Sequence, residues 1–486
     1  MAETDDDVPE LEDAWVVDNS LRECPLSIAY IASIRDFDHK SSTRHINDLP
    51  PEILTKILQY SPIQFHSAPF SYDASRYILR MVSPTWNSLV EAEPALWSHI
   101  YIGQHTVIRK LALWIQRAGS MPISLAFQLS EPLNGPTVFV DPSPYRSKWL
   151  NLLATVSPIM AQCVHVSIQA HNPQTTRFLL AFLSILDASA VCHIDLRLFP
   201  YGMHVLRHVD NTDGIFTVPL LFANNTPSLQ YLAIYGFFTT WGASPILTNL
   251  TTLRLQHLYD EYSPTVDELF TVLGAAPRLE TLYLLDVGCI GYDNYTVDPP
   301  PMASLVVLYF SGYDEICSCL FSIMPLPTVT TLQLQLDGGR SLQVFLAHCG
   351  ELCRQVTILV MDISLGSVQV LIDIFQAFPN VEHLDARAMA PYFTVALHSI
   401  VAHWTSLCPA LGTILVDEYV EPFLLHLIHS RANDGLFGRR PLHIISPTGF
   451  DTDNNPTIPY TSTFKDGLVV YNSSVTTLSD GFAPEF

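Results

Sequence analysis

Most of the chain repeats one short pattern of hydrophobic positions. The pattern is L-x-x-L-x-L, where L is a hydrophobic, usually aliphatic residue and x is any residue. Eight copies follow one another at steps of 21 to 30 residues, and they begin at Leu229, Leu250, Leu279, Leu305, Val329, Val356, Val381 and Leu411. Weaker copies precede them at Ile123, Cys163 and Val191. Because side chains alternate between the two faces of a strand, each copy predicts a short β-strand with one hydrophobic face.

Between the copies, hydrophobic residues recur at i, i+3 and i+4, which is typical of amphipathic helices. These helical stretches cover residues 265–273, 341–348, 368–378 and 393–404. A proline often precedes the next copy, where it ends the helix and favours extended backbone. These prolines are Pro227, Pro277, Pro327, Pro379 and Pro409. Each unit is therefore expected to be a strand followed by a helix, with parallel strands and with helices on the outside.

The repeat length is typical of leucine-rich repeats, which stack in one dimension. The asparagine that often follows the pattern in regular repeats is missing from most copies, so an irregular array is expected. Such an array also accommodates 486 residues, which are too many for one ordinary globular core. The sequence thus predicts an α/β solenoid with a parallel inner sheet and outer helices over residues 103–445. A C-terminal cap and tail are expected over residues 446–486.

A different pattern occupies residues 45–102. Leu49 and Pro50 precede a short helix, which Asp48 can cap and whose positive end carries Glu52. Four aliphatic residues share one stripe of this helix, namely Ile53, Leu54, Ile57 and Leu58. For an amphipathic helix taken at random, packing into the chain's own core is the commoner reason for such a stripe.

Two tryptophan motifs follow in the same region. Trp86 lies in a second helical stretch, and Pro94-Ala95-Leu96-Trp97 closes the region. Because a proline inside a helix removes a hydrogen bond, Pro84 predicts a break near Ser83.

In this order, the Leu-Pro start, the tryptophan and the Pro-x-Leu-Trp end resemble an F-box, a small three-helix module. The resemblance implies binding to the Skp adaptor of the Skp, cullin and F-box ubiquitin ligases, and through it to a cullin. The matching adaptor-contact positions are Leu49, Pro50, Ile53, Leu54, Ile57 and Leu58; those that hold the helices together are Trp86, Leu96 and Trp97. Pro84 and the long link over residues 61–75 depart from the family pattern. The chain as a whole is similar to the large fungal sets of F-box proteins with degenerate leucine-rich arrays.

The central x positions of the repeated pattern are candidates for binding a target protein. In consecutive copies they are Arg254, Tyr283, Tyr309 and Gln333. Neighbouring strands lie about 4.8 Å apart, so these residues are expected to form one contiguous row. Tyrosine ring faces offer contact area, and arginine can bind a carboxylate or phosphate. The alternatives are a merely solvated sheet face, or an arginine that is paired with an acidic neighbour.

Composition excludes several classes of partner. Hydrophobic residues make up 48% of the chain and charged residues 15%, which indicates a folded protein. The formal net charge of −23 argues against nucleic acid and anionic membranes, because phosphate groups are bound by clustered lysine and arginine. No secretory signal or membrane-spanning run is visible, so a cytoplasmic and/or nuclear location with reduced cysteines is expected. Residues 1–44 are acidic and are expected to be partly flexible.

The sequence carries no Walker A motif, dinucleotide fingerprint, His-Glu-x-x-His or Gly-x-Ser-x-Gly. Closely spaced metal-ligand pairs lack a clear third and fourth ligand, and these pairs are His204/His208, His426/His429, Cys317/Cys319 and Cys349/Cys353. We therefore expect no enzyme activity, cofactor or metal. The interpretation is a substrate receptor that holds an unknown target protein near a ubiquitin ligase. The alternatives are a leucine-rich interaction scaffold without a ligase role, and an enzyme with an unfamiliar site.

Overall fold

The structure is a computed structural model that describes most of the repeated region and part of what precedes it. The described residues are 49–60, 71–103, 106–129, 143–170, most of 179–198, 226–236, 245–258, 263–289, 295–312, 324, 326–336, 339–363, 368–386, 410–415, 443–445, 462–464 and 468–470. The predicted acidic segment 1–44, the predicted helix 393–404 and most of the predicted tail lie outside the described residues. The chain divides into two compact units, Met1–Ile57 and Leu58–Phe486.

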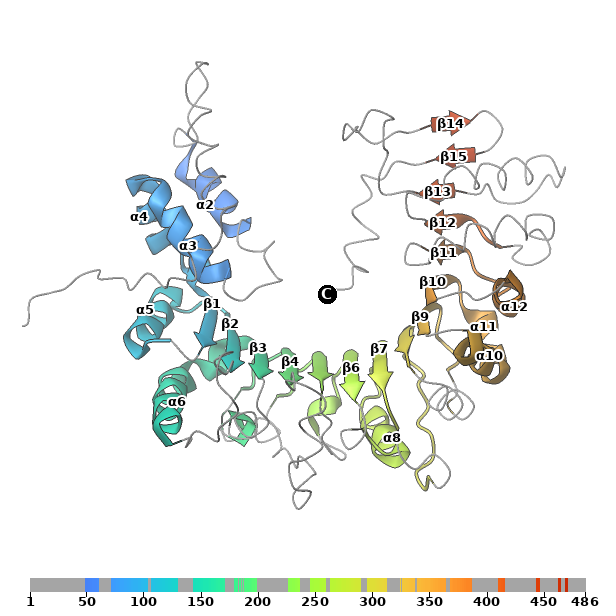
Figure 1. Cartoon of the computed structure of the whole chain (residues 1–486). Coiled ribbons are helices and arrows are strands. Elements are labelled where there is room, and N and C mark those ends of the chain that lie inside the picture. Colours follow the sequence, from blue (N-terminus) through green and yellow to red (C-terminus); the bar gives the residue numbers. More distant parts are fainter. Residues whose placement is uncertain are drawn as a thin grey trace, which may run out of the picture. The chain divides into compact units, whose positions relative to one another are not determined.

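The second unit is built on one sheet, which has fifteen strands in the described part of the chain (Figure 1). The first thirteen are β1 (His99–Gly103), β2 (Ile123–Leu129), β3 (Cys163–Ala170), β4 (His193–Leu198), β5 (Tyr231–Tyr235), β6 (Thr252–Leu258), β7 (Thr281–Val287), β8 (Val307–Ser311), β9 (Thr331–Leu336), β10 (Ile358–Ile363), β11 (His383–Asp385), β12 (Thr413–Leu415) and β13 (His443–Ile445). Each is parallel to the next. The predicted α/β class with a parallel sheet is therefore confirmed.

The repeated pattern predicts most of these strands correctly. The eight copies give β5 to β12, and the three weaker copies give β2, β3 and β4. The pattern does not predict β1, which falls within the region 45–102. It also misses β13, β15 (Leu468–Val470), which pairs parallel with β13, and β14 (Ser462–Phe464), which pairs antiparallel with β15. These last two strands extend the sheet into the segment that was expected to be a cap and tail.

The core of the repeated region consists of aligned rows of buried aliphatic side chains. Leu282 pairs in register with Leu308, and Leu308 with Leu332, across β7, β8 and β9. All three are buried, as is the leucine or valine that begins each of the eight copies. The hydrophobic faces that the pattern predicts for single strands therefore join into one continuous core.

Helices cover one face of this sheet (Figure 1). In the repeated region they are α8 (Val266–Gly274), α10 (Gly339–His348), α11 (Gly350–Gln355) and α12 (Val368–Ala377). Three of them match predicted helices, whereas the short α11 was not predicted. Helix α8 begins with a capping box, in which Thr265 and Glu268 each accept from the other's backbone N–H. Its buried residues include Leu269, Phe270 and Leu273.

Further helices precede and interrupt the first strands. In the described residues they are α2 (Pro51–Tyr60), α3 (Ser71–Val82), α4 (Pro84–Ala92), α5 (Ile108–Ala118), α6 (Ser143–Val156) and the 3-10 turns η4 (Pro94–Trp97), η5 (Ser157–Gln162) and η8 (Pro245–Leu247). The predicted break at Ser83 is confirmed. This residue is extended and caps α4, because its Oγ accepts from the Trp86 N–H at 3.2 Å. Pro84 then occupies the first helical position, where no N–H is needed.

The buried leucine rows predict a strong asymmetry between the two faces of strand β7. Leu282→Ala should lower the free energy of unfolding by about 2 to 5 kcal/mol, because it leaves a cavity in the continuous core. The matched control is Leu285→Ala, at a half-buried position on the opposite face of the same strand. Urea denaturation followed by circular dichroism should show a clearly lower midpoint for Leu282→Ala only. Equal losses for the two variants would contradict the register of the core.

Candidate protein-binding surfaces

The four residues predicted to bind a target lie side by side across β6 to β9. Arg254 pairs in register with Tyr283, Tyr283 with Tyr309, and Tyr309 with Gln333. We call this row the strip. The buried residues before and after each member, which are leucines except for Phe310, belong to the opposite face of the sheet. The structure thus brings together all four residues that the pattern predicts.

The aromatic members of the strip stack on one another. The ring centroids of Tyr283 and Tyr309 lie 4.0 Å apart, with 13° between the ring planes. On the other side, Cζ of Arg254 lies 5.5 Å from the Tyr283 ring centroid. The expectation that ring faces are offered to a partner is therefore wrong, because the spacing of neighbouring strands is close to the stacking distance of two rings. The ring edges and hydroxyl groups remain for contact with a partner.

The strip is not equally accessible along its length. Tyr309 is only 7% exposed, and its burial is the main reason why its pKa is raised. A hydrogen bond with Tyr283 also favours its protonated form. Arg254, Tyr283 and Gln333 are all half-buried. Tyr309 therefore supports the strip, and the other three residues can reach a partner.

Arg254 forms its polar contacts with neutral groups in the described part of the chain. Its Nε donates to Oε1 of Gln256 at 3.1 Å, and a further hydrogen bond joins it to the Tyr231 side chain. Among the described residues, no carboxylate forms an ion pair with it. Arg197 on β4 does have an acidic partner, because its guanidinium donates hydrogen bonds of 2.7 to 3.1 Å to the carboxylate of Asp195. Pairing of Arg254 with an acidic neighbour, one of the alternatives above, is not observed in this part of the chain.

A second row of rings, on β3 to β5, was not predicted. His193 stacks on Tyr231 with centroids 3.9 Å apart and packs edge-on against His165 at 4.2 Å. At its start, Oγ of Ser124 lies 3.1 Å from Nδ1 of His165. His165, His193 and Tyr231 occupy the second x position of their copies, and the four residues pair in register. Reading the second x positions as well as the central ones would have found them.

Where strands β5, β6 and β7 end, their backbones turn into the left-handed region. The residues concerned are Gly236 (φ 80°), His257 (φ 52°) and Asp286 (φ 53°), which follow residues that pair in register. Nδ1 of His257 lies 3.2 Å from Oδ2 of Asp286, and Ser311 donates to Oδ1 of Asp286 at 2.8 Å. The serine thus bonds the carboxylate and not the imidazole, so this is not the order of contacts that activates a serine nucleophile.

Helix α2 carries the positions that the resemblance assigns to adaptor contact. Ile53 and Ile57 are 42% and 39% exposed, whereas Leu54 is 1% exposed. Pro50 is exposed and Leu49 is half-buried. The side chain of Leu58 lies outside the description. The predicted stripe is therefore divided, with one buried leucine and two isoleucines that present apolar surface to solvent.

Helix α3 presents a second apolar surface that was not predicted. Its exposed large hydrophobic residues are Tyr77, Ile78, Met81 and Val82, and Met81 is the most exposed of them at 66%. They repeat the i, i+1, i+4, i+5 spacing of the α2 stripe, and this signal could have found them. Large exposed hydrophobic residues that gather on one helix mark interaction surfaces more often than isolated ones do.

The opposite face of α3 is held by the buried Arg76. Its Nε donates to the Leu96 carbonyl at 2.7 Å, and Nη2 donates to the His99 carbonyl. Its Cζ lies 5.3 Å from the Trp97 ring centroid and 5.4 Å from that of Trp114. These contacts join α3 to η4, β1 and α5, so α3 belongs to the same rigid cluster as the first strand.

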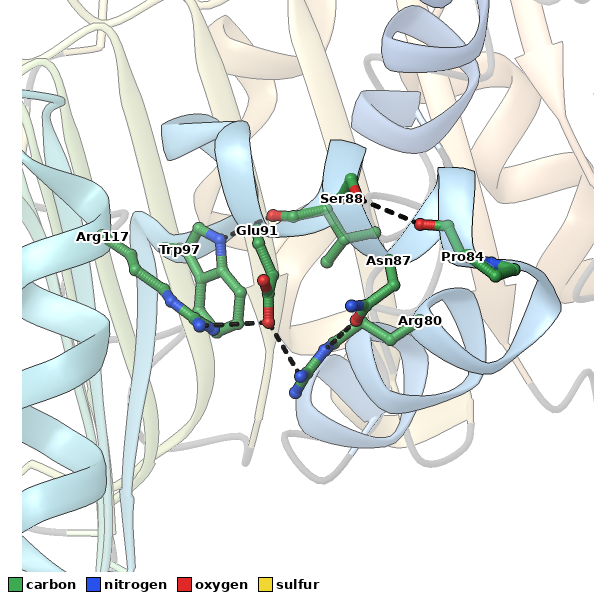
Figure 2. A network of polar contacts seen from close by, with 8 residues as sticks. Arg80, Pro84, Asn87, Ser88, Glu91, Trp97 and Arg117 are labelled. Atoms are coloured by element: carbon green, nitrogen blue, oxygen red, sulfur yellow. Dashed lines mark hydrogen bonds and ion pairs between the residues drawn. The ribbon is translucent and has the colours of Figure 1, made fainter. Parts of the chain in front are cut away.

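Figure 2 shows a polar network that ties α3, α4 and α5 together. Glu91 on α4 accepts from Arg80 at 2.9 Å and from Arg117 at 3.2 Å. Arg80 also donates to Asn87, and the Trp97 indole donates to the Val90 carbonyl at 2.8 Å. The three residues that the resemblance assigns to the interior of this region are all buried: Trp86, Leu96 and Trp97.

Comparison with known proteins does not assign the chain to a family. No protein-family model matches the chain, and no curated protein matches it. Within the described residues, no group of histidine, cysteine, aspartate or glutamate side chains is placed to hold a metal ion. No helix in that part of the chain has the length and hydrophobicity needed to cross a membrane.

The stacked histidines predict a dependence of stability on pH. Burial, followed by the charge of His165, lowers the pKa of His193 from 6.5 to about 4. Between these values the unfolded chain binds a proton that the folded chain does not, so stability falls as the pH falls from 7.5 to 5.5. Urea denaturation at both values should show that His193→Gln loses less stability than the parent, by a difference on the order of 1 kcal/mol.

The matched control is His383→Gln, which removes an exposed imidazole from β11 in the same row of the sheet. Its change in stability over the same pH range is the reference with which His193→Gln is compared. An unchanged pH dependence in His193→Gln would show that this imidazole is not held in its neutral form.

Proposed function

We propose that this chain is a substrate receptor of a Skp, cullin and F-box ubiquitin ligase. Residues 45–102 bind the Skp adaptor, and a leucine-rich-repeat-like array over residues 103–445 binds a target protein. The chain itself makes and breaks no bond. It raises the effective concentration of the target's lysines near the conjugating enzyme that the ligase carries.

One observation carries the adaptor half of this proposal. A helix of ten residues that follows Leu49-Pro50 exposes two branched aliphatic side chains, Ile53 and Ile57, at positions that match adaptor contacts. Exposing both to water forgoes the roughly 2 kcal/mol that burial of each would contribute. A protein partner that covers them accounts for their exposure.

Helix α3 adds support from an independent element. Its exposed surface around Met81 is apolar, while Arg76 fixes its other face to η4 and α5. A rigid helix that presents hydrophobic residues can bind a partner with little loss of conformational entropy. We therefore propose a second, separate contact for the adaptor on α3, made by Tyr77, Ile78, Met81 and Val82.

The array half of the proposal rests on the parallel sheet and on the strip. Successive strands at steps of 21 to 30 residues are what leucine-rich repeats produce. The sheet face that carries Arg254 and Tyr283 presents the residue types most often found at binding hot spots. The strip is therefore the proposed contact region for the target.

The alternative is a scaffold that binds the target but serves no ligase. As a receptor or as a scaffold, the chain would bind the target with the same sheet face. The two roles differ in whether the bound target is ubiquitinated and degraded, so turnover of the target separates the receptor from the scaffold.

The adaptor surface is tested by a double substitution on α2. Ile53→Ala with Ile57→Ala should weaken binding of the purified Skp adaptor by about a hundredfold or more, because buried interface anchors can each contribute 2 kcal/mol. The matched control is Leu113→Ala on α5, which removes an aliphatic side chain that is 41% exposed and should leave the affinity unchanged. Calorimetric titration measures both. Parent-like affinity in the double variant would contradict the proposal.

A further inference from the structure

We propose that the strip recognises a carboxylate-bearing side chain, glutamate or aspartate, in an extended segment of the target protein. This inference rests on the proposed function, since it concerns the same sheet face. It adds the chemistry of the bound segment and names Arg254 as the residue that selects it.

The first step is the charge balance of the face. Arg197 and Asp195 neutralise each other on β4, and His257 lies against Asp286 beyond the strip. Arg254 contacts only neutral groups among the described residues, which are Gln256, Tyr231 and the Tyr283 ring. As far as the described residues show, the centre of the face therefore carries one positive charge without an ion pair, in a chain whose net charge is −23.

The second step is the orientation of the rings. Tyr283 has Tyr309 on one face and Arg254 on the other, and Tyr231 is likewise stacked on His193. What these rings leave for a partner is their edges and hydroxyl groups. The edge of an aromatic ring is the positive part of its quadrupole, and a phenol can donate a hydrogen bond. The surroundings of Arg254 therefore also favour an anionic oxygen.

The charge of this face fits a carboxylate better than a phosphate. A phosphorylated side chain carries nearly two negative charges and is usually bound by a cluster of arginines. Among the described residues of this face, Arg254 is the one guanidinium without an ion pair, and it can neutralise only one of the two charges of a dianion. The sequence contains no lysine from 150 to 463, so the array offers no ammonium group as a second cation. A single carboxylate matches this balance.

Hydrogen bonds and stacking restrain the guanidinium of Arg254. Its Nε is bonded to Gln256, and Tyr231 takes a further hydrogen bond. Because a guanidinium has five N–H donors in a fixed plane, these two bonds restrain its orientation and leave donors for a carboxylate. Stacking on Tyr283 restrains it further. Arg254 is thus held in place before a partner arrives, which lowers the entropic cost of binding.

The experiment uses the purified full-length chain and three octapeptide libraries with one fixed central residue, which is glutamate, glutamine or phosphoserine. Fluorescence anisotropy should show that the glutamate library binds about tenfold more tightly than the glutamine library. The phosphoserine library should bind no more tightly than the glutamate library. Rising salt should reduce the preference for glutamate, because the interaction is partly exposed.

Substitutions assign this preference to one side chain. Arg254→Gln should abolish the preference for glutamate, whereas Arg254→Lys should keep part of it, because the charge remains and the planar donor set is lost. The control Arg278→Gln removes an exposed arginine that bonds only Asn249 among described residues, and it should behave like the parent. Binding of purified Skp adaptor is measured on the same samples, and Arg254→Gln should retain it.

The outcomes distinguish this inference from the proposed function. Equal binding of the glutamate and glutamine libraries to the parent, or a glutamate preference that survives Arg254→Gln, overturns the inference alone. A strong preference for phosphoserine replaces the carboxylate with a phosphopeptide and also overturns it. If the parent prefers glutamate but does not bind the adaptor, the inference stands and the proposed ligase role fails.

Discussion

The sheet register, which the buried aliphatic rows impose, is the constraint on which the rest of the structure depends. Leu282, Leu308 and Leu332 pair directly across three strands, so a shift of one residue would move each of them to the opposite face of the sheet. Because the register is fixed on the buried face, it is fixed on the other face as well. Residues that lie 21 to 30 positions apart in the chain thereby become neighbours, and a binding surface arises from side chains that share no local sequence.

The same register determines the electrostatics of that surface. Aromatic residues at equivalent positions of adjacent strands are brought to stacking distance, so their faces are covered and their edges remain. The stack that contains Tyr231 and the stack that contains Arg254 meet at a hydrogen bond between these two side chains. The arginine is restrained by this contact and by Gln256, yet no carboxylate among the described residues neutralises it. A surface built largely from neutral residues thus acquires a localised positive charge.

Much of the architecture could be predicted from the sequence, because burial leaves a periodic signal. The eight copies of the pattern predict β5 to β12, and Pro84 predicts the helix break that Ser83 caps. Contacts made by the polar positions leave no such signal. The stacking of Tyr283 on Tyr309 and the left-handed backbone of His257 and Asp286 depend on distances between strands. Strand β1 carries no copy of the pattern and was missed for that reason.

In the proposed function, the adaptor binds α2 and α3, and the target binds the strip on β6 to β9. Hydrogen–deuterium exchange of the full chain, with and without purified Skp adaptor, tests this assignment most directly. The account predicts slower exchange over residues 51–60 and 71–82 when the adaptor is present, with unchanged exchange in β6, β7 and β8. Protection confined to those strands, or no protection at any peptide, would contradict it.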